Sequence, residues 1–154
     1  MRLHLFPAAV LVWSTAAAVL FVGAGPSARA ADLKFEAHLV WGTDDSKPPA
    51  GKDYKPVDPE IRKKLSELPL KWKNWFEVNK KAFSVPPTGT NVPISDKCEL
   101  ILKIPGGSNV EVALIGKGKE VGRHKQPIAK GELLVLGGPA PNDTGWLVVL
   151  KRTE

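Results

Sequence analysis

The sequence predicts a mainly β protein: a compact antiparallel β-sandwich or small β-barrel of about seven to eight short strands with one short helix at about residues 59–68. Two observations carry this prediction. Turn residues recur about every 8–12 positions between short apolar segments, which is typical of sandwiches and barrels. The βαβ alternation and the glycine motifs of nucleotide-binding folds are missing from the sequence. Because strand order decides whether a sheet closes, sandwich and barrel both stay open.

Residues 33–41 predict the first strand, because apolar and polar side chains alternate along them. The apolar face consists of Leu33, Phe35, Ala37, Leu39 and Trp41. The opposite face carries Lys34, Glu36 and His38. This pattern indicates a strand with one buried face.

A short helix is predicted after the proline-rich loop of residues 46–57. Asp58 is expected at its N-cap, and Pro59 at its first position, where a missing N–H costs nothing. The helical spacing of the apolar side chains predicts one stripe against a core. That stripe consists of Ile61, Leu65 and Leu68. Pro69 is expected to end the helix.

The rest of the chain has the composition of short strands separated by turns. They are predicted at residues 71–78, 82–85, 98–104, 110–115, 120–124, 132–136 and 146–151. The last two are nearly continuously apolar, which predicts burial on both faces. The connection between them, residues 137–145, is rich in Gly, Pro, Asn and Asp and therefore predicts a long hairpin tip.

Residues 1–30 have the features of a cleavable signal peptide. A basic start precedes an uncharged stretch at residues 6–25, and Ala28-Arg29-Ala30 has the pattern of small residues before a cleavage site. The expected product is a single β-rich domain, residues 31–154, in the periplasm or outside the cell, with no membrane span after cleavage. The alternative is a retained anchor, since about 20 apolar residues can cross a bilayer.

Composition limits the chemistry of this domain. Cys98 is the only cysteine, so no intramolecular disulfide can form and packing must hold the fold. The net charge of +6 is concentrated, because residues 62–81 contain seven basic and two acidic side chains. Such a patch favours anionic partners, and export argues against nucleic acid. The partner is expected to be a protein or an anionic envelope polymer, and the oligomeric state stays open.

The predicted binding surface lies within this basic segment. Lysines interleave with two tryptophans over residues 71–78, so cationic groups and an aromatic ring could share a face. If Trp72 shares the core face with Phe76 and Val78, Trp75 is exposed on the other face. The residues proposed to bind are Lys63, Lys64, Lys71, Lys73, Trp75 and Lys80. The alternative is that both tryptophan rings are core or edge packing and that the lysines form a solvated face, which protects a sheet edge.

Catalytic residues are harder to find. A small hydrolase could use Cys98 with His38 or His124, but no spacing ties either histidine to the thiol. Cys98 has the parity of the apolar positions on its strand, which favours a buried, inert thiol. No catalytic residue is therefore assigned.

Neither a metal nor a cofactor is predicted from these residues. The two scattered histidines of residues 31–154 and the one cysteine do not form a zinc motif. Turn chemistry explains Asp44 and Asp45, and also Asn142 and Asp143, better than calcium binding does.

Together these patterns predict an exported, non-catalytic binding or assembly module. Two alternatives are kept. One is the small secreted hydrolase, and the other is an adaptor or inhibitor that acts through the 137–145 hairpin tip, since long ordered loops often carry function.

Overall fold

The computed structural model describes residues 31–154, and the predicted signal peptide lies outside the described residues. The chain forms two antiparallel sheets, which confirms the β-sandwich of the two predicted architectures. The elements are β1 (Leu33–Thr43), β2 (Lys55–Pro56), α1 (Pro59–Ser66), β3 (Asn74–Val85), β4 (Thr90–Ser95), β5 (Cys98–Gly106), β6 (Asn109–Gly116), β7 (Lys119–Pro127), β8 (Leu133–Pro139) and β9 (Gly145–Arg152). Within residues 31–154, no helix is long and apolar enough to span a membrane.

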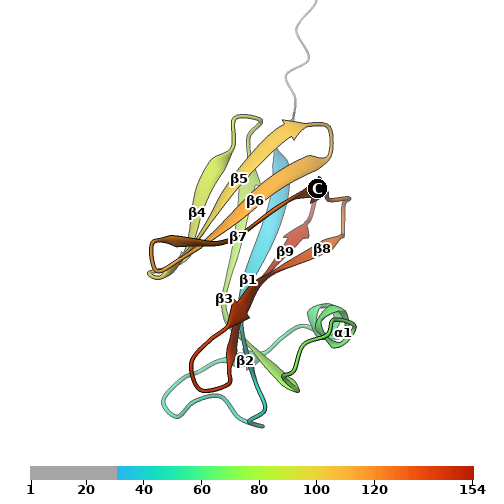
Figure 1. Ribbon diagram of the computed structural model, residues 1–154. Coiled ribbons are helices and arrows are strands. Elements are labelled where there is room, and N and C mark those ends of the chain that lie inside the picture. Colours follow the sequence, from blue (N-terminus) through green and yellow to red (C-terminus); the bar gives the residue numbers. More distant parts are fainter. Residues whose placement is uncertain (1–30) are drawn as a thin grey trace, which may run out of the picture.

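The strand order explains how the chain builds two layers (Figure 1). The five-stranded sheet has the order β2-β3-β1-β9-β8, and the four-stranded sheet is the meander β4-β5-β6-β7. The chain therefore crosses between the sheets twice, after β3 and after β7. β1 lies in the middle of its sheet, paired with β3 on one side and β9 on the other.

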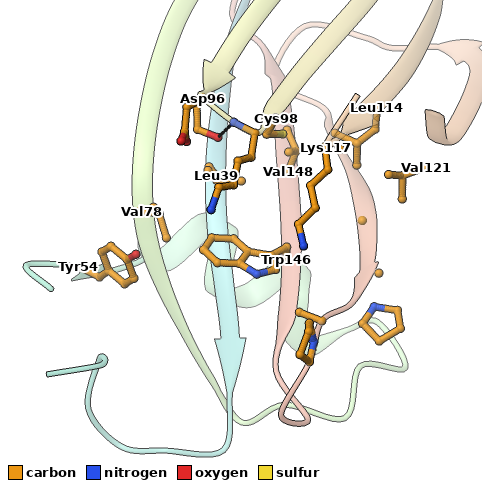
Figure 2. Close-up of a pocket in the computed structure, with 18 of the residues that line it drawn as sticks. Leu39, Tyr54, Val78, Asp96, Cys98, Leu114, Lys117, Val121, Trp146 and Val148 are labelled. Atoms are coloured by element: carbon orange, nitrogen blue, oxygen red, sulfur yellow. Dashed lines mark hydrogen bonds between the residues drawn. The ribbon is translucent and has the colours of Figure 1, made fainter. Parts of the chain in front are cut away.

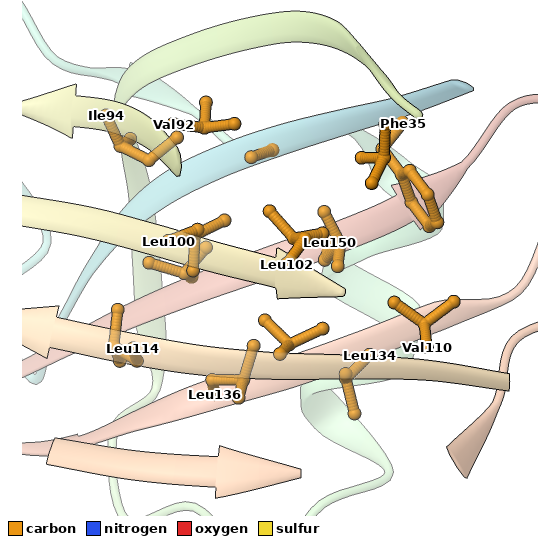
Figure 3. Packing of buried hydrophobic residues seen from close by; sticks show 14 of the residues in the cluster. Phe35, Val92, Ile94, Leu100, Leu102, Val110, Leu114, Leu134, Leu136 and Leu150 are labelled. Atoms are coloured by element: carbon orange, nitrogen blue, oxygen red, sulfur yellow. The ribbon is translucent and has the colours of Figure 1, made fainter. Parts of the chain in front are cut away.

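The main core lies between the two sheets, as Figure 3 shows. The alternation predicted for the first strand is confirmed, because Phe35, Ala37 and Leu39 all point into this core. The other layer contributes the matching positions of β5 and β6, including Leu100, Leu102, Val110 and Val112.

A second apolar cluster covers the outer face of the five-stranded sheet. Ile61 and Leu65 of α1 pack on Val40 of β1 and on Leu147 and Val149 of β9. The predicted helical stripe is thus confirmed, although α1 ends at Ser66 rather than at residue 68. β9 is buried on both faces, as its continuous apolar sequence predicts, since Val148 and Leu150 point to the other side.

Trp72 anchors the segment that follows α1. Its side chain is 6% exposed and lies over the cross-strand glycine pair Gly42 and Gly145 of β1 and β9. The indole Nε1–H donates to the carbonyl oxygen of Asp143 at 2.6 Å. Side chains at the two glycines would meet the indole ring, so the pair is needed for this contact.

Three features of the strands differ from the sequence prediction. The short strand β2 lies within the predicted loop of residues 46–57. The two predicted strands at 71–78 and 82–85 are one strand, β3, which begins only at Asn74 because Trp72 and Lys73 belong to the segment before it. β4 was not predicted, because Pro93 and the polar residues around it weaken the strand pattern. β4 is an edge strand, where a proline without an N–H is tolerated.

The glycine under Trp72 gives a test of this packing. Gly145→Ala places a methyl group into the indole ring, and overpacking of this kind costs about 1–3 kcal/mol of unfolding free energy. Gly138→Ala on neighbouring β8 is the matched control, because its methyl group would meet no atom within 4 Å. Urea unfolding should show a loss only for Gly145→Ala, and equal stabilities would contradict the packing described for Trp72.

Candidate functional site

A cleft opens between the sheets at the end where the four-stranded sheet stops. It forms because the inward-facing stripes of three strands end in small residues. The stripe of β6 runs through Val112 and Leu114 to Gly116, and that of β8 runs through Leu136 to Gly138. On β5 the corresponding position is Cys98. At this end the core therefore has too little side-chain volume to close.

The cleft has a volume of about 730 Å³ and an apolar floor, shown in Figure 2. Leu39 and Val148 form the floor together with Val78 and Leu114. Two large apolar side chains stand at the mouth, namely Trp146, which is 40% exposed, and Val121, which is 55% exposed. The residues 137–141 of the hairpin tip form one wall.

The rim of the cleft is basic. Lys52, Lys97 and Lys117 line it, with Asp96 as the acidic neighbour. Lys117 lies in the tight turn between β6 and β7 with φ of 50°, a left-handed conformation that side chains other than Gly, Asn and Asp rarely adopt. Its backbone N–H donates to the carbonyl of Lys97 at 2.8 Å, which joins the two turns of the rim.

Cys98 is half-buried at the cleft, and burial raises the pKa of its thiol. The structure does not bring it to either histidine. His38 lies on the outer face of the other sheet. His124 of β7 lies opposite Val112 of β6, which in turn lies opposite Leu102 of β5. Because Leu102 is four residues from Cys98, His124 is displaced from Cys98 by about 13 Å along the strand direction. A nucleophile needs its base at hydrogen-bond distance, so this geometry does not support the predicted hydrolase pair.

The predicted basic surface is dispersed in the structure. Lys63 and Lys64 lie in the last turn of α1. Lys71 forms an ion pair with Asp143 at 2.9 Å, and its Nζ lies 5.8 Å from the ring centre of Trp72. Lys80 pairs with the carboxylate of Glu36 at 3.0 Å. Lys73 is exposed, and its backbone N–H binds the Asp44 carboxylate.

The predicted exposure of Trp75 is wrong. Trp75 is on the face opposite Phe76, as its position predicts, but α1 covers that face and Trp75 packs against the second apolar cluster. Its indole Nε1 is buried without a hydrogen-bond partner in the described part of the chain. Trp72 is also misplaced by the prediction, since it precedes β3 and lies on the outer face rather than in the sandwich core.

A polar cluster lies on the outer face next to the N-terminal end of α1. We call Glu36, His38, Asp58, Glu77 and Lys80 the His38 cluster. His38 is on the polar face of β1, as predicted, but it is only 1% exposed. Its Nδ1 lies 2.6 Å from Glu77 Oε2, and its Nε2 lies 2.8 Å from Glu36 Oε1.

Charge pairing between Glu36 and Lys80 shifts the pKa of both side chains. Burial would raise the pKa of the Glu36 carboxyl, but the hydrogen bond and charge of Lys80, together with the His38 ring, outweigh it and lower the pKa. The hydrogen bond to Glu36 in turn raises the pKa of Lys80. Glu36 is therefore an anion and Lys80 a cation at neutral pH.

The same cluster contains donors for a metal ion. One ligand atom each from His38, Asp58 and Glu77 lie within 4.8 Å of one another. Sequence spacing did not reveal this group, because its members come from β1, the loop before α1 and β3. Asp58 occupies the predicted N-cap position, but its side chain makes no cap hydrogen bond.

The backbone conformation of Asn142 and Asp143 agrees with the turn-chemistry interpretation, whereas the side chain of Asp44 binds outside its own turn. Asp44 accepts the N–H of Lys73, and Asn142 and Asp143 have φ of 64° and 56° in the β8–β9 hairpin. Asx residues adopt this left-handed conformation more readily than most.

Comparisons of the chain with protein-family models, curated proteins and solved structures found no match.

Proposed function

We propose that this domain is a non-catalytic binding module whose ligand is an anionic amphiphile held in the cleft between the sheets. The observation that carries the proposal is the ending of three core stripes in Gly116, Gly138 and Cys98, which leaves an apolar cleft open to solvent. Its volume is within the range of about 300–1,000 Å³ that is usual for small-molecule sites.

The lining indicates the chemistry of the ligand. An apolar chain or ring would contact Leu39, Val78 and Val148 and displace water from them, which is favourable in proportion to the area buried. Trp146 offers a large, rigid surface at the mouth. The lysines of the rim would attract a negative group that stays outside the apolar floor.

The position of Lys117 supports the role of the rim. A lysine in left-handed backbone costs of order 1 kcal/mol, and strain of this kind persists where the surroundings hold it. An asparagine before Gly118 would suit the turn better, since Asn-Gly is favoured in such hairpins. Lysine at this position is therefore explained by its charge at the cleft rather than by the turn.

The cleft is a better candidate binding site than the basic surface predicted from the sequence. That surface lacks an exposed aromatic anchor, because Trp75 packs under α1, and two of its lysines are paired with acids. The hairpin-tip alternative merges with the present proposal, since residues 137–141 form a wall of the cleft.

Export remains part of the proposal and rests on residues 1–30. In the periplasm or outside the cell, an anionic envelope polymer that carries acyl chains would have the required chemistry. A partner protein would need an apolar side chain next to acidic groups.

Filling the cleft should prevent binding. Gly138→Leu adds a side chain whose Cβ meets no atom within 4 Å and which extends into the cleft that Gly138 lines. Calorimetric titration with decanoate, a simple anionic amphiphile, should show affinity for the wild type and at least a ten-fold loss for Gly138→Leu, since steric mismatch in an apolar pocket is worth about 1–3 kcal/mol.

Gly122→Leu is the matched control for this substitution. Gly122 also has free space around its Cβ, but it does not line the cleft, so decanoate binding should be unchanged. Decanol tests the charge requirement and should bind more weakly than decanoate. Equal binding of decanoate to the wild type and Gly138→Leu would contradict the cleft as the site.

Lys117→Asn should separate stability from binding. The substitution gives the turn the favoured Asn-Gly pair and should raise the unfolding free energy by about 0.5–1 kcal/mol. It also removes one rim charge, so decanoate affinity should fall about two- to five-fold at low salt. Urea unfolding and calorimetry measure the two effects, and unchanged affinity would exclude Lys117 from the site.

A further inference from the structure

The contacts of His38 require a positive centre. Both ring nitrogens face carboxylate oxygens, at 2.6 Å for Glu77 and 2.8 Å for Glu36. A neutral imidazole has only one N–H, so at one contact a nitrogen lone pair would face a negative oxygen. Either a second proton or a metal ion must therefore lie between His38 and one of the two acids.

Asp58 identifies the side on which a metal ion would fit. Its carboxylate approaches His38 and Glu77, with the ligand atoms of all three residues within 4.8 Å of one another. An aspartate at an N-cap normally accepts a hydrogen bond from the first turn of its helix, but Asp58 makes none. Its side chain is therefore free to act as a third ligand.

The charge of the cluster also favours a cation. Three carboxylates, those of Glu36, Asp58 and Glu77, surround one imidazole. Lys80 pairs with Glu36 at 3.0 Å, and Lys55 lies opposite Glu77 in the sheet. Lys151 lies opposite Glu36 but pairs with Glu60 outside the cluster, so one negative charge remains in excess. Repulsion between the carboxylates is strong in a partly buried site, because the effective dielectric constant is lower than in water. A divalent ion would neutralise the excess.

We propose that His38, Asp58 and Glu77 bind one zinc ion or a similar first-row divalent ion. One nitrogen and two carboxylate oxygens suit such ions, whereas calcium prefers six to eight oxygen ligands. Bonds of about 2.0–2.2 Å in a tetrahedral site separate ligand atoms by about 3.4 Å. The Nδ1–Oε2 distance must therefore open from 2.6 Å by less than one ångström. Water supplies the fourth ligand from the exposed side of Asp58.

Glu36 has a different role in this site. It accepts the Nε2–H of His38, which fixes the tautomer that leaves Nδ1 free for the metal. Carboxylate–histidine–metal chains of this form are common, and loss of the carboxylate typically weakens metal binding about 10–100-fold. Lys80 holds Glu36 in place from the other side. Glu36 is thus a positioning residue rather than a ligand.

Zinc titration of the purified protein, after removal of bound metals with a chelator, tests the proposal. Calorimetry should show one ion per chain, and zinc at about 100 times its Kd should raise Tm by about 10 °C. Asp58→Asn should lower the zinc affinity at least ten-fold while the circular-dichroism spectrum stays native, since asparagine also suits an N-cap. Glu36→Gln should weaken zinc binding about ten-fold.

Glu60→Gln is the matched control, because Glu60 is on the same turn of α1 but pairs with Lys151 outside the cluster. His124→Gln controls for zinc at the exposed histidine of β7. Both should bind zinc as the wild type does. Zinc binding that Asp58→Asn leaves unchanged, or no binding at millimolar zinc, would overturn the proposal. Neither control nor variant lines the cleft, so this test is independent of the proposed ligand.

Discussion

Burial of both faces of the five-stranded sheet is the constraint on which the rest of the structure depends. β9 carries large apolar side chains on each face, and β1 adds its apolar inner face and Val40 on the outer face. Exposing this apolar surface would cost about 25 cal/mol per Å². The four-stranded sheet covers the inner face. The outer face is covered by α1 and by Trp72, which closes on the glycine pair of β1 and β9. The helix and the segment after it therefore belong to the hydrophobic core and are not peripheral additions to the sandwich.

Both candidate sites lie where one of these covers ends. On the inner face the four-stranded sheet ends at Cys98 and Gly116. The five-stranded sheet continues beyond that end as far as Trp146, and the cleft lies there. On the outer face the apolar cluster under α1 ends beside His38, whose cross-strand neighbour Val149 still belongs to that cluster. A buried imidazole is tolerated there because carboxylate oxygens lie within hydrogen-bond distance of both of its nitrogens.

Local patterns predicted much of the fold, whereas both sites depend on packing between distant segments. Period-two alternation placed Leu39 inward and His38 outward, and the helical stripe of α1 was also predicted correctly. No local pattern indicated that α1 would cover the face that carries Trp75 or that carboxylates would enclose His38, so both were expected at the surface. One signal for the cleft was present in the sequence, because Gly116 and Gly138 each occupy the next inward position of an apolar stripe. Asp58 could be assigned its cap position but not the direction of its carboxylate.

One irregularity in β3 links the two sites. The pairing of β1 with β3 shifts between Leu39 and Val40, so that Leu39 lies opposite Asn79 while Val40 lies opposite Glu77, and Val78 is the extra residue. Because a shift of one residue reverses the facing of every later side chain, the bulge turns Glu77 outward to His38. The same shift leaves Val78 in the floor of the cleft. With regular pairing, Glu77 would point into the sandwich, where the His38 cluster would lose a carboxylate and the apolar core would gain an unpaired charge. The bulge is therefore what allows a polar site and an apolar site to lie back to back across one sheet.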